Sequence, residues 1–393
     1  MNKKQLLQVC IDDRFRHMKR NNFNIPLSKK LNIDLLAKFI ILLVNSIGLR
    51  WTEKIIFVDE VRNSSMITSI RNTIEECPYG YCILNFRAYE RNKHVRIGCV
   101  YPLYLILRLC LYHLLIFLLL PFVGKEKVNE MSSRQLINCF DLYLSKMDCD
   151  GKPMKAYCMT DHNFYSTIVC VNEKFESYVI QHGLILTVDY YYPIYADHFL
   201  AWGEHSYHLL PDPQKALIVG TYKFSKLKEL RQKPDNRVLL YCVSIVDDRK
   251  VNKKIDDLLS VLPHLNMKLA AKMHPGSFYS ISDLEKKYGG ENGVRFYKEC
   301  ALADIDFDVA VIENSTILLD LCYLGKPFII FDDEKGYFDA YDYEVPHVHT
   351  KEELVNELEH QNVDSYAYLK SIVIEKELNG GQCDIFSTAV DST

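Results

Sequence analysis

The sequence predicts an α/β protein of two domains, each built around a parallel β-sheet. Three observations support this prediction: the chain has 393 residues, 48% of them are hydrophobic, and short apolar runs alternate with helical patterns. Because a domain has roughly 100–200 residues, the chain is long enough for two domains of similar size. Nearly continuous apolar strands that alternate with helices are typical of parallel sheets covered on both faces.

Six short apolar runs predict the strands of the first domain, for which we expect residues 1–222. They are Ile55–Val58, Cys82–Phe86, Ala156–Met159, Tyr178–Ile180, Phe199–Trp202 and Leu217–Val219. Two longer apolar segments, 33–51 and 100–123, are predicted as helices of the same domain. The polar, lysine-rich segment 223–234 is predicted to link the domains.

Segment 100–123 is long enough to cross the roughly 30 Å of hydrocarbon in a bilayer. Arg108 and His113 lie in its middle, and an arginine at the bilayer centre costs about 2.5 to 3.5 kcal/mol. We therefore favour a helix that is buried in the protein or lies at a membrane interface over one that spans it. Residues 1–30 hold eight lysines and arginines against two aspartates, a charge of 8 minus 2, or +6. Such a segment either binds an anionic bilayer surface or is simply a solvated face.

The second domain, for which we expect residues 235–393, shows the clearest alternation of strands and helices. Its strands are predicted at Val238–Val243, Leu269–Met273, near Val294, Val309–Ile312 and Phe328–Phe331, and its helices at Val251–Leu262, Ile281–Tyr288 and Ile317–Leu324. Gly325 is predicted to end the last helix in a left-handed conformation, and Pro327 prevents its continuation. The pattern is that of a doubly wound α/β domain.

Composition excludes several classes of function. The formal net charge of -4 gives no overall positive potential that would attract nucleic acid. The thirteen cysteines are scattered, with no Cys-x-x-Cys pair and no Cys/His cluster at metal-ligand spacing, so we expect no disulfides, no metal site and no cofactor. The N-terminus lacks the apolar core of a secretory signal, which predicts a cytoplasmic location.

In parallel α/β sheets, ligands bind beyond the carboxyl ends of the strands. His274 and Pro275 follow a predicted strand of the second domain, and an imidazole there can donate to a phosphate oxygen. Ser315 and Thr316 lie at the start of the helix at Ile317, where free N–H groups and the helix dipole bind phosphate. The alternatives left open are a purely structural histidine and a serine that only caps the helix.

Gln181, His182 and Gly183 follow a strand of the first domain. We predict that His182 is a general base for an acceptor hydroxyl, with Gln181 and Gly183 beside the acceptor. Asp161 is a second candidate base or a group that orients His182, and Asp197 is predicted to line the cleft. The alternative is a turn with a structural histidine.

Taken together, the motifs resemble those of bacterial surface-polysaccharide glycosyltransferases of the GT-B fold. The resemblance covers residues 150–335 and is closest to the capsule-polysaccharide and Kdo transferases and the bacterial sialyltransferases, and more distant to the CDP-glycerol glycerophosphotransferases. Its motifs are Gln181-His182-Gly183, Ala196-Asp197, Trp202-Gly203, Lys272-Met273-His274-Pro275, Glu313-Asn314-Ser315-Thr316 and Gly325-Lys326-Pro327.

The resemblance implies two Rossmann-like domains that face a cleft, with the donor bound by the second domain and the acceptor by the first. It implies that His182 is the base and that His274, Ser315 and Thr316 hold the nucleotide phosphate, while Glu313 touches the nucleotide or its ribose. The full donor side would then comprise His274, Pro275, Glu313, Asn314, Ser315 and Thr316.

The implied activity is transfer of a sugar, without a metal, from a nucleotide-sugar donor to a glycan or lipid-linked glycan of capsule, O-antigen or lipopolysaccharide. A CMP-linked donor such as Kdo or sialic acid is preferred, with UDP- and CDP-linked donors as rivals, and the protein would lie peripherally at the inner membrane. Leu184 replaces the Thr-Pro that follows His-Gly in the glycerophosphotransferases, and the acidic sialyltransferase motif is absent. The alternatives are a CDP-polyol phosphotransferase, a nucleotide-sugar 2-epimerase and a non-catalytic assembly subunit.

Overall fold

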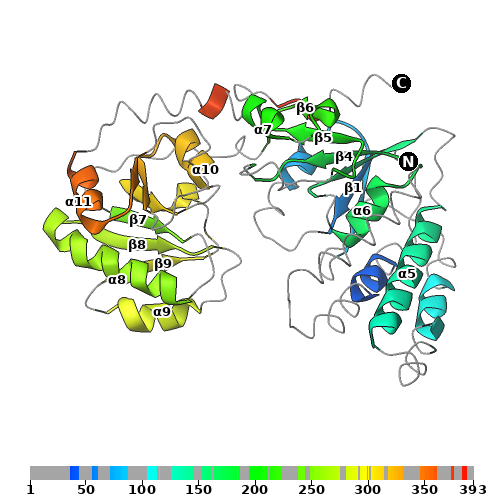
Figure 1. Cartoon of the computed structure of the whole chain (residues 1–393), viewed down its shortest axis with the longest axis horizontal. Coiled ribbons are helices and arrows are strands. Elements are labelled where there is room, and N and C mark those ends of the chain that lie inside the picture. Colours follow the sequence, from blue (N-terminus) through cyan, green and yellow to red (C-terminus); the bar gives the residue numbers. More distant parts are fainter. Residues whose placement is uncertain are drawn as a thin grey trace.

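The computed structural model describes two parallel sheets and the helices around them (Figure 1). The residues described are 36–43, 55–60, 71–86, 104–112, 115, 125–145, 153–160, 163–183, 185, 194–210, 212–222, 238–243, 248–274, 280–290, 293–298, 300, 302–313, 317–331, 346–360, 373–375 and 383–386. The linker expected at 223–234 lies outside them.

The first sheet has six parallel strands in the order β2-β1-β3-β4-β5-β6. The strands are β1 (Ile55–Asp59), β2 (Tyr81–Asn85), β3 (Met154–Cys158), β4 (Phe175–Ile180), β5 (His198–Ala201) and β6 (Ala216–Ile218). Every residue of β1 and β3 is buried because both faces of the sheet are covered. All six strands predicted from the apolar runs are confirmed, with ends that differ by at most three residues.

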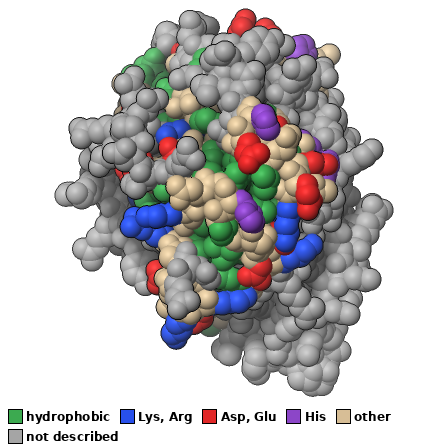
Figure 2. Space-filling model, turned by 90° about the vertical axis from the view of Figure 1, so that its left-hand side faces the viewer, with side chains coloured by type: hydrophobic (Ala, Val, Ile, Leu, Met, Phe, Trp, Pro, Cys, Tyr) green, Lys and Arg blue, Asp and Glu red, His purple; other side chains and the backbone are tan. Residues whose placement is uncertain are grey.

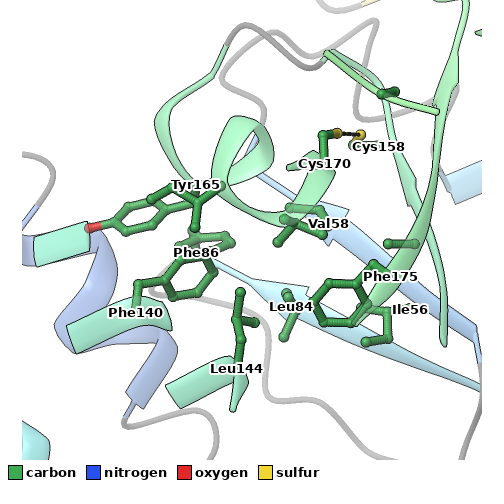
Figure 3. Close-up of a cluster of buried hydrophobic side chains, with 14 of the residues drawn as sticks. Ile56, Val58, Leu84, Phe86, Phe140, Leu144, Cys158, Tyr165, Cys170 and Phe175 are labelled. Atoms are coloured by element: carbon green, nitrogen blue, oxygen red, sulfur yellow. Dashed lines mark hydrogen bonds between the residues drawn. The ribbon is translucent and has the colours of Figure 1, made fainter. Parts of the chain in front are cut away.

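One face of this sheet is covered by helices that pack through aromatic and aliphatic side chains. These are α5 (Lys125–Leu144), α6 (Phe164–Cys170) and the helices at 36–43 and 104–112. Figure 3 shows the centre of this core, where the Tyr165 ring stacks on Phe86 at 4.7 Å and meets Phe140 edge-on at 4.9 Å. α7 (Glu204–Leu209) and the short 3₁₀ helix Pro213–Lys215 connect β5 to β6.

The two long apolar segments of the sequence both contribute to this core. In the helix at 36–43, Phe39, Leu42 and Leu43 are buried. In the helix at 104–112, Leu105 and Leu109 are buried while the opposite face is exposed. Within the part of the chain that the structure describes, no helix is both long and apolar enough to cross a bilayer.

The second sheet also has six parallel strands, in the order β12-β11-β10-β7-β8-β9. Its strands are β7 (Val238–Cys242), β8 (Lys268–Lys272), β9 (Arg295–Tyr297), β10 (Val309–Ile312), β11 (Phe328–Phe331) and β12 (His347–Val348). The helices are α8 (Asp248–Leu265), α9 (Ile281–Tyr288), α10 (Ile317–Leu324), α11 (Lys351–Glu359) and the 3₁₀ helix Leu302–Asp304. The strand order reverses between β7 and β10, so the doubly wound prediction is confirmed.

Local signals explain how two helices of the second unit end and begin. Gly325 has a φ of 65°, and its N–H donates to the Cys322 carbonyl at 3.0 Å, which confirms the predicted stop of α10. At α11 the Thr350 hydroxyl accepts from the Glu353 N–H while the Glu353 carboxylate accepts from the Thr350 N–H. This capping box begins a helix that the apolar pattern alone did not predict.

The last described residues of the chain pack on the first unit, although residues 235–393 were expected to form the second. Ile385 and Phe386 are buried in the cluster that contains Phe57 and Tyr157 of the first sheet. The Asp384 N–H also donates to the carbonyl of Val219 at 2.7 Å. The second unit therefore ends before residue 383, and the last described segment packs on the sheet of the first.

Candidate functional site

His182 lies just beyond the carboxyl end of β4 and is half-buried. Its Nδ1 is 2.8 Å from the carbonyl oxygen of Met159, which follows the neighbouring strand β3. A carbonyl oxygen only accepts hydrogen bonds, so this contact requires the proton on Nδ1. The neutral ring then has its lone pair at Nε2, the atom that a general base needs.

Gln181 is buried and fully engaged within the protein. Its amide nitrogen donates to the Gly183 carbonyl and to the Ser206 hydroxyl, both at 2.8 Å, and its Oε1 accepts from the Trp202 N–H at 2.7 Å. Gln181 was predicted beside the acceptor, and in the structure its side chain fixes the backbone on either side of His182. Gly183 is also buried, and it contributes a backbone acceptor to this network.

Trp202 connects this network to the second unit. It follows β5, is 1% exposed, and belongs to the hydrophobic cluster that contains Cys242, Ile312 and Leu318. All other residues of this cluster belong to the second unit, so Trp202 packs against that unit. The bond from Trp202 to Gln181 thus ties the His182 turn to the contact between the units.

Asp197, which was predicted to line the cleft, lies at the other end of the first sheet from His182. It precedes the first residue of β5 and therefore lies at the amino end of the parallel sheet. Its Oδ2 accepts from the backbone N–H of Ser177 at 3.0 Å and from the Ser177 hydroxyl at 2.8 Å. The side chain joins β4 to the start of β5, a structural role for which sequence order gave no signal.

Glu60, directly after β1, is a buried carboxylate at the same edge as His182. Its Oε2 accepts from the backbone N–H groups of Tyr165 and Ser166 at 2.9 and 2.8 Å, at the start of α6. Lys38 lies 3.7 Å from its Oε1. Burial, and then the Glu60 charge, raise the pKa of Tyr165 well above its ordinary value. This carboxylate occupies the positive end of α6, where a phosphate would otherwise bind.

At the carboxyl edge of the second sheet, His274 follows β8 and Glu313 follows β10. Both are half-buried. Burial lowers the pKa of His274, and the nearby Lys272 lowers it further. β7 lies between β8 and β10, so the two side chains start from strands about 10 Å apart.

Glu313 is held by a tyrosine from the central strand. The Tyr241 hydroxyl donates to Glu313 Oε1 at 2.8 Å. The Tyr241 side chain is fully buried in β7, so the bond fixes one carboxylate oxygen. Sequence reasoning missed Tyr241, because it is one of several apolar or aromatic residues in a buried strand.

Five of the predicted site residues lie outside the described residues: Asp161, Pro275, Asn314, Ser315 and Thr316. The group that orients His182 in the structure is the Met159 carbonyl, and a backbone carbonyl leaves no trace in the sequence. Glu60 could have been found, since it stands at the end of a predicted strand, as Glu313 does. Among the described residues, no three His, Cys, Asp or Glu side chains gather as metal ligands would.

Comparisons with known proteins show the fold of the chain. No family model matches it, and no curated protein matches its sequence. A solved structure of a putative UDP-N-acetylglucosamine 2-epimerase from Listeria monocytogenes is 10% identical, covers 80% of this chain and 90% of its own, and gives a TM-score of 0.50. The S. aureus MnaA structure with UDP is 11% identical over 85% and 93% of the two chains, with a TM-score of 0.49.

The wall teichoic acid polymerase TagF is also similar, at 14% identity over 82% of this chain and 83% of that one, with a TM-score of 0.41. At these identities the likeness concerns architecture. The chain has a GT-B-like fold of two α/β units, each with a parallel six-stranded sheet.

Proposed function

We propose that the protein is a glycosyltransferase that moves a sugar from a nucleotide-sugar donor to a hydroxyl of a bacterial surface glycan. The observation that carries this proposal is the bond from His182 Nδ1 to the Met159 carbonyl, which leaves Nε2 as the basic atom. In the second unit, His274 and Glu313 form a separate polar group at the carboxyl edge. One edge thus offers a base and the other offers donors for a phosphate.

In the proposed reaction, His182 Nε2 takes the proton of the acceptor hydroxyl as the oxygen attacks the anomeric carbon. The bond from that carbon to the phosphate oxygen breaks, and the nucleotide leaves with the electron pair. His274 donates to the leaving phosphate, and from their place in the sequence Ser315 and Thr316 add hydroxyls at the start of α10. Glu313, fixed by Tyr241, accepts from hydroxyls of the ribose.

The electrostatics favour the second unit as the donor side. In the first unit, the Glu60 carboxylate already occupies the N-terminus of α6 and would repel a phosphate. Near His274 the adjacent charge is that of Lys272, which attracts one. We propose a CMP-linked donor such as Kdo or sialic acid on the basis of the motif resemblance, with UDP- and CDP-linked donors as rivals.

For the acceptor we propose a glycan of capsule, O-antigen or lipopolysaccharide, presented on a lipid at the cytoplasmic face of the inner membrane. The basic segment 1–30 and the exposed face of the helix at 104–112 support this choice. The second candidate function is a nucleotide-sugar 2-epimerase, because the fold matches that of the Listeria monocytogenes protein. An epimerase acts on a soluble substrate and has no use for an apolar surface.

Two successive measurements test the proposal. A thermal-shift titration with CMP, CDP, UMP, UDP, GDP and ADP identifies the nucleotide, since a ligand of the native state raises stability by RT ln(1 + [L]/Kd). Product analysis with the corresponding nucleotide-sugar follows. A transferase releases the nucleotide only when acceptor is present, and a polyol phosphotransferase releases CMP from CDP-polyols. An epimerase changes the sugar and keeps the nucleotide attached, and binding without any turnover would indicate a non-catalytic subunit.

A further inference from the structure

The helix at 104–112 presents an apolar face to solvent. Tyr104, Leu107, Leu111 and Leu115, which we call the leucine stripe, are 50%, 60%, 54% and 58% exposed. Their spacing of three or four residues places them on one side of a helix. On the other side, Leu105 and Leu109 are completely buried in the core of the first unit. The helix therefore buries one apolar face in the core of the first unit and exposes apolar side chains on the other.

The leucine stripe differs from the rest of the described surface. Outside it, the only large hydrophobic side chains that are exposed among the described residues are Tyr79 and Ile218, which stand alone. The face of the second unit in Figure 2 mixes acidic, basic and histidine side chains around smaller apolar areas. A contiguous exposed apolar stripe on a stable helix is typical of a surface that contacts a membrane or a partner.

Positive charge accompanies the leucine stripe. Arg108 is exposed on the same helix, one position from Leu107. The helix at 36–43 packs in the same core as Leu105 and Leu109, and residues 1–30, with their charge of +6, precede it in the chain. Five residues separate Lys30 from Leu36, so the end of the basic segment lies within roughly 20 Å of the helix at 36–43.

We propose that the leucine stripe is a docking surface for an anionic lipid bilayer. The four apolar side chains enter the boundary between headgroups and acyl chains, while Arg108 and the basic segment bind lipid phosphates. An apolar face combined with basic groups is the pattern of helices that lie in the membrane interface. The choice of a bilayer rests in part on the proposed function, because a lipid-linked acceptor would lie in that bilayer.

Vesicle binding tests this inference without any turnover. The full chain is mixed with sedimentable vesicles of phosphatidylcholine alone or of phosphatidylcholine with phosphatidylglycerol, and the bound fraction is measured. Leu107→Gln/Leu111→Gln keeps good helix formers in the exposed face and should lower binding to anionic vesicles by about tenfold or more. Tyr79→Gln/Ile218→Gln removes the same kind of exposed side chain elsewhere and should bind like the wild type.

A separate variant tests how much positive charge contributes to vesicle binding. Arg108→Glu should weaken binding to anionic vesicles by roughly fivefold or more and leave the weak binding to neutral vesicles unchanged. Because the substituted side chains are exposed, each variant should keep the wild-type fold, and its thermal melting curve checks this.

Two results would overturn the inference. One is a wild-type chain that does not bind anionic vesicles, or that binds them equally well as the stripe double variant. The other is a wild-type dimer, seen by sedimentation, that the double variant converts to a monomer with vesicle binding unchanged, which would make the stripe an interface between two copies. Neither result bears on nucleotide binding, so failure of this inference is distinct from failure of the proposed function.

Discussion

The carboxyl edges of the two sheets share a geometry and differ in chemistry. At the first edge the polar side chains are engaged internally: Glu60 closes the start of α6, and the Gln181 amide bonds to Gly183, Ser206 and Trp202. His182 stands in this rigid frame with its proton on Nδ1. At the second edge His274 and Glu313 are half-buried, and the Tyr241 hydroxyl donates to Glu313.

This difference indicates how one architecture, used twice in the chain, can perform two tasks. A carboxylate at a helix N-terminus makes the first edge unfavourable for phosphate, while rigid hydrogen bonds suit it to hold a base in one orientation. An edge with a histidine and a neighbouring lysine suits an anionic ligand. Substitutions at the two edges should therefore separate catalysis from donor binding.

The largest effect is expected at His182. His182→Ala should lower the turnover number about 10²–10⁴-fold, because it removes the proposed general base, while the nucleotide Kd stays unchanged. His198→Ala is the matched control, since His198 starts β5 at the opposite end of the same sheet and bonds to Glu176. Equal turnover in the two variants would remove His182 from the mechanism.

Among the residues of the first edge, Glu60 should contribute most to the free energy of unfolding. Glu60→Ala leaves two N–H groups of α6 and the Lys38 ammonium without their carboxylate, which should lower the free energy of unfolding by about 3 kcal/mol. Glu60→Gln keeps an oxygen that can accept from α6, so its loss should be smaller. Urea unfolding measures both, and equal stability of the two variants would contradict the capping role of this side chain.

Gln181 should affect both stability and catalysis. Gln181→Met keeps the shape but removes three hydrogen bonds, which should cost about 2 kcal/mol in the free energy of unfolding. Because the same bonds fix the turn at His182, kcat should fall in the folded variant while the nucleotide Kd remains as in the wild type. A change confined to the Kd would place Gln181 on the donor side instead.

The pH dependence of nucleotide binding should follow His274. Its pKa is lowered in the free protein by burial and Lys272, and a bound phosphate would raise it. Between these two pKa values binding takes up a proton, so the affinity should fall as the pH rises, by at most about tenfold per pH unit. Calorimetric titrations of the wild type and of His274→Asn measure this, and the slope should be shallower in the variant; identical slopes would exclude His274 from the phosphate site.

The smallest effect is expected at Tyr241. Tyr241→Phe removes the bond to Glu313 and should weaken nucleotide binding by roughly fivefold. Tyr288→Phe is the matched control, because its hydroxyl bonds to Asn252 between α9 and α8, away from the edge. Similar Kd values for both variants would indicate that the Tyr241 bond does not position Glu313 for the ligand.

The fold could be predicted from the sequence further than the site. Short, β-branched apolar runs such as Val309–Ile312 favour buried strands, and Gly325 with Pro327 marks the end of α10. These boundaries agree with the structure. α5 was missed, because its apolar residues are interrupted by many charges and polar side chains. The return of Ile385 and Phe386 to the first sheet depends on tertiary packing that no local pattern records.

For the site, the sequence placed His182, His274 and Glu313 at strand ends, and the structure has all three there. The bonds of Asp197 to Ser177 left no signal in the sequence, although its place before the predicted strand at Phe199 already put it at the amino end of the sheet. Nor could the sequence distinguish Gln181, which fixes the turn from within, from its half-buried neighbour His182. Those distinctions depend on which hydrogen bonds form in three dimensions.

The most direct test of the division between the two edges is a calorimetric titration of the nucleotide that the thermal-shift panel identifies. It is titrated into the wild type, His182→Ala and His274→Ala. His182→Ala should bind it with the wild-type Kd, and His274→Ala should bind it at least about tenfold more weakly, because a bond to a charged phosphate is lost. Loss of binding in His182→Ala with full binding in His274→Ala would contradict the account, and would place the phosphate at the first edge.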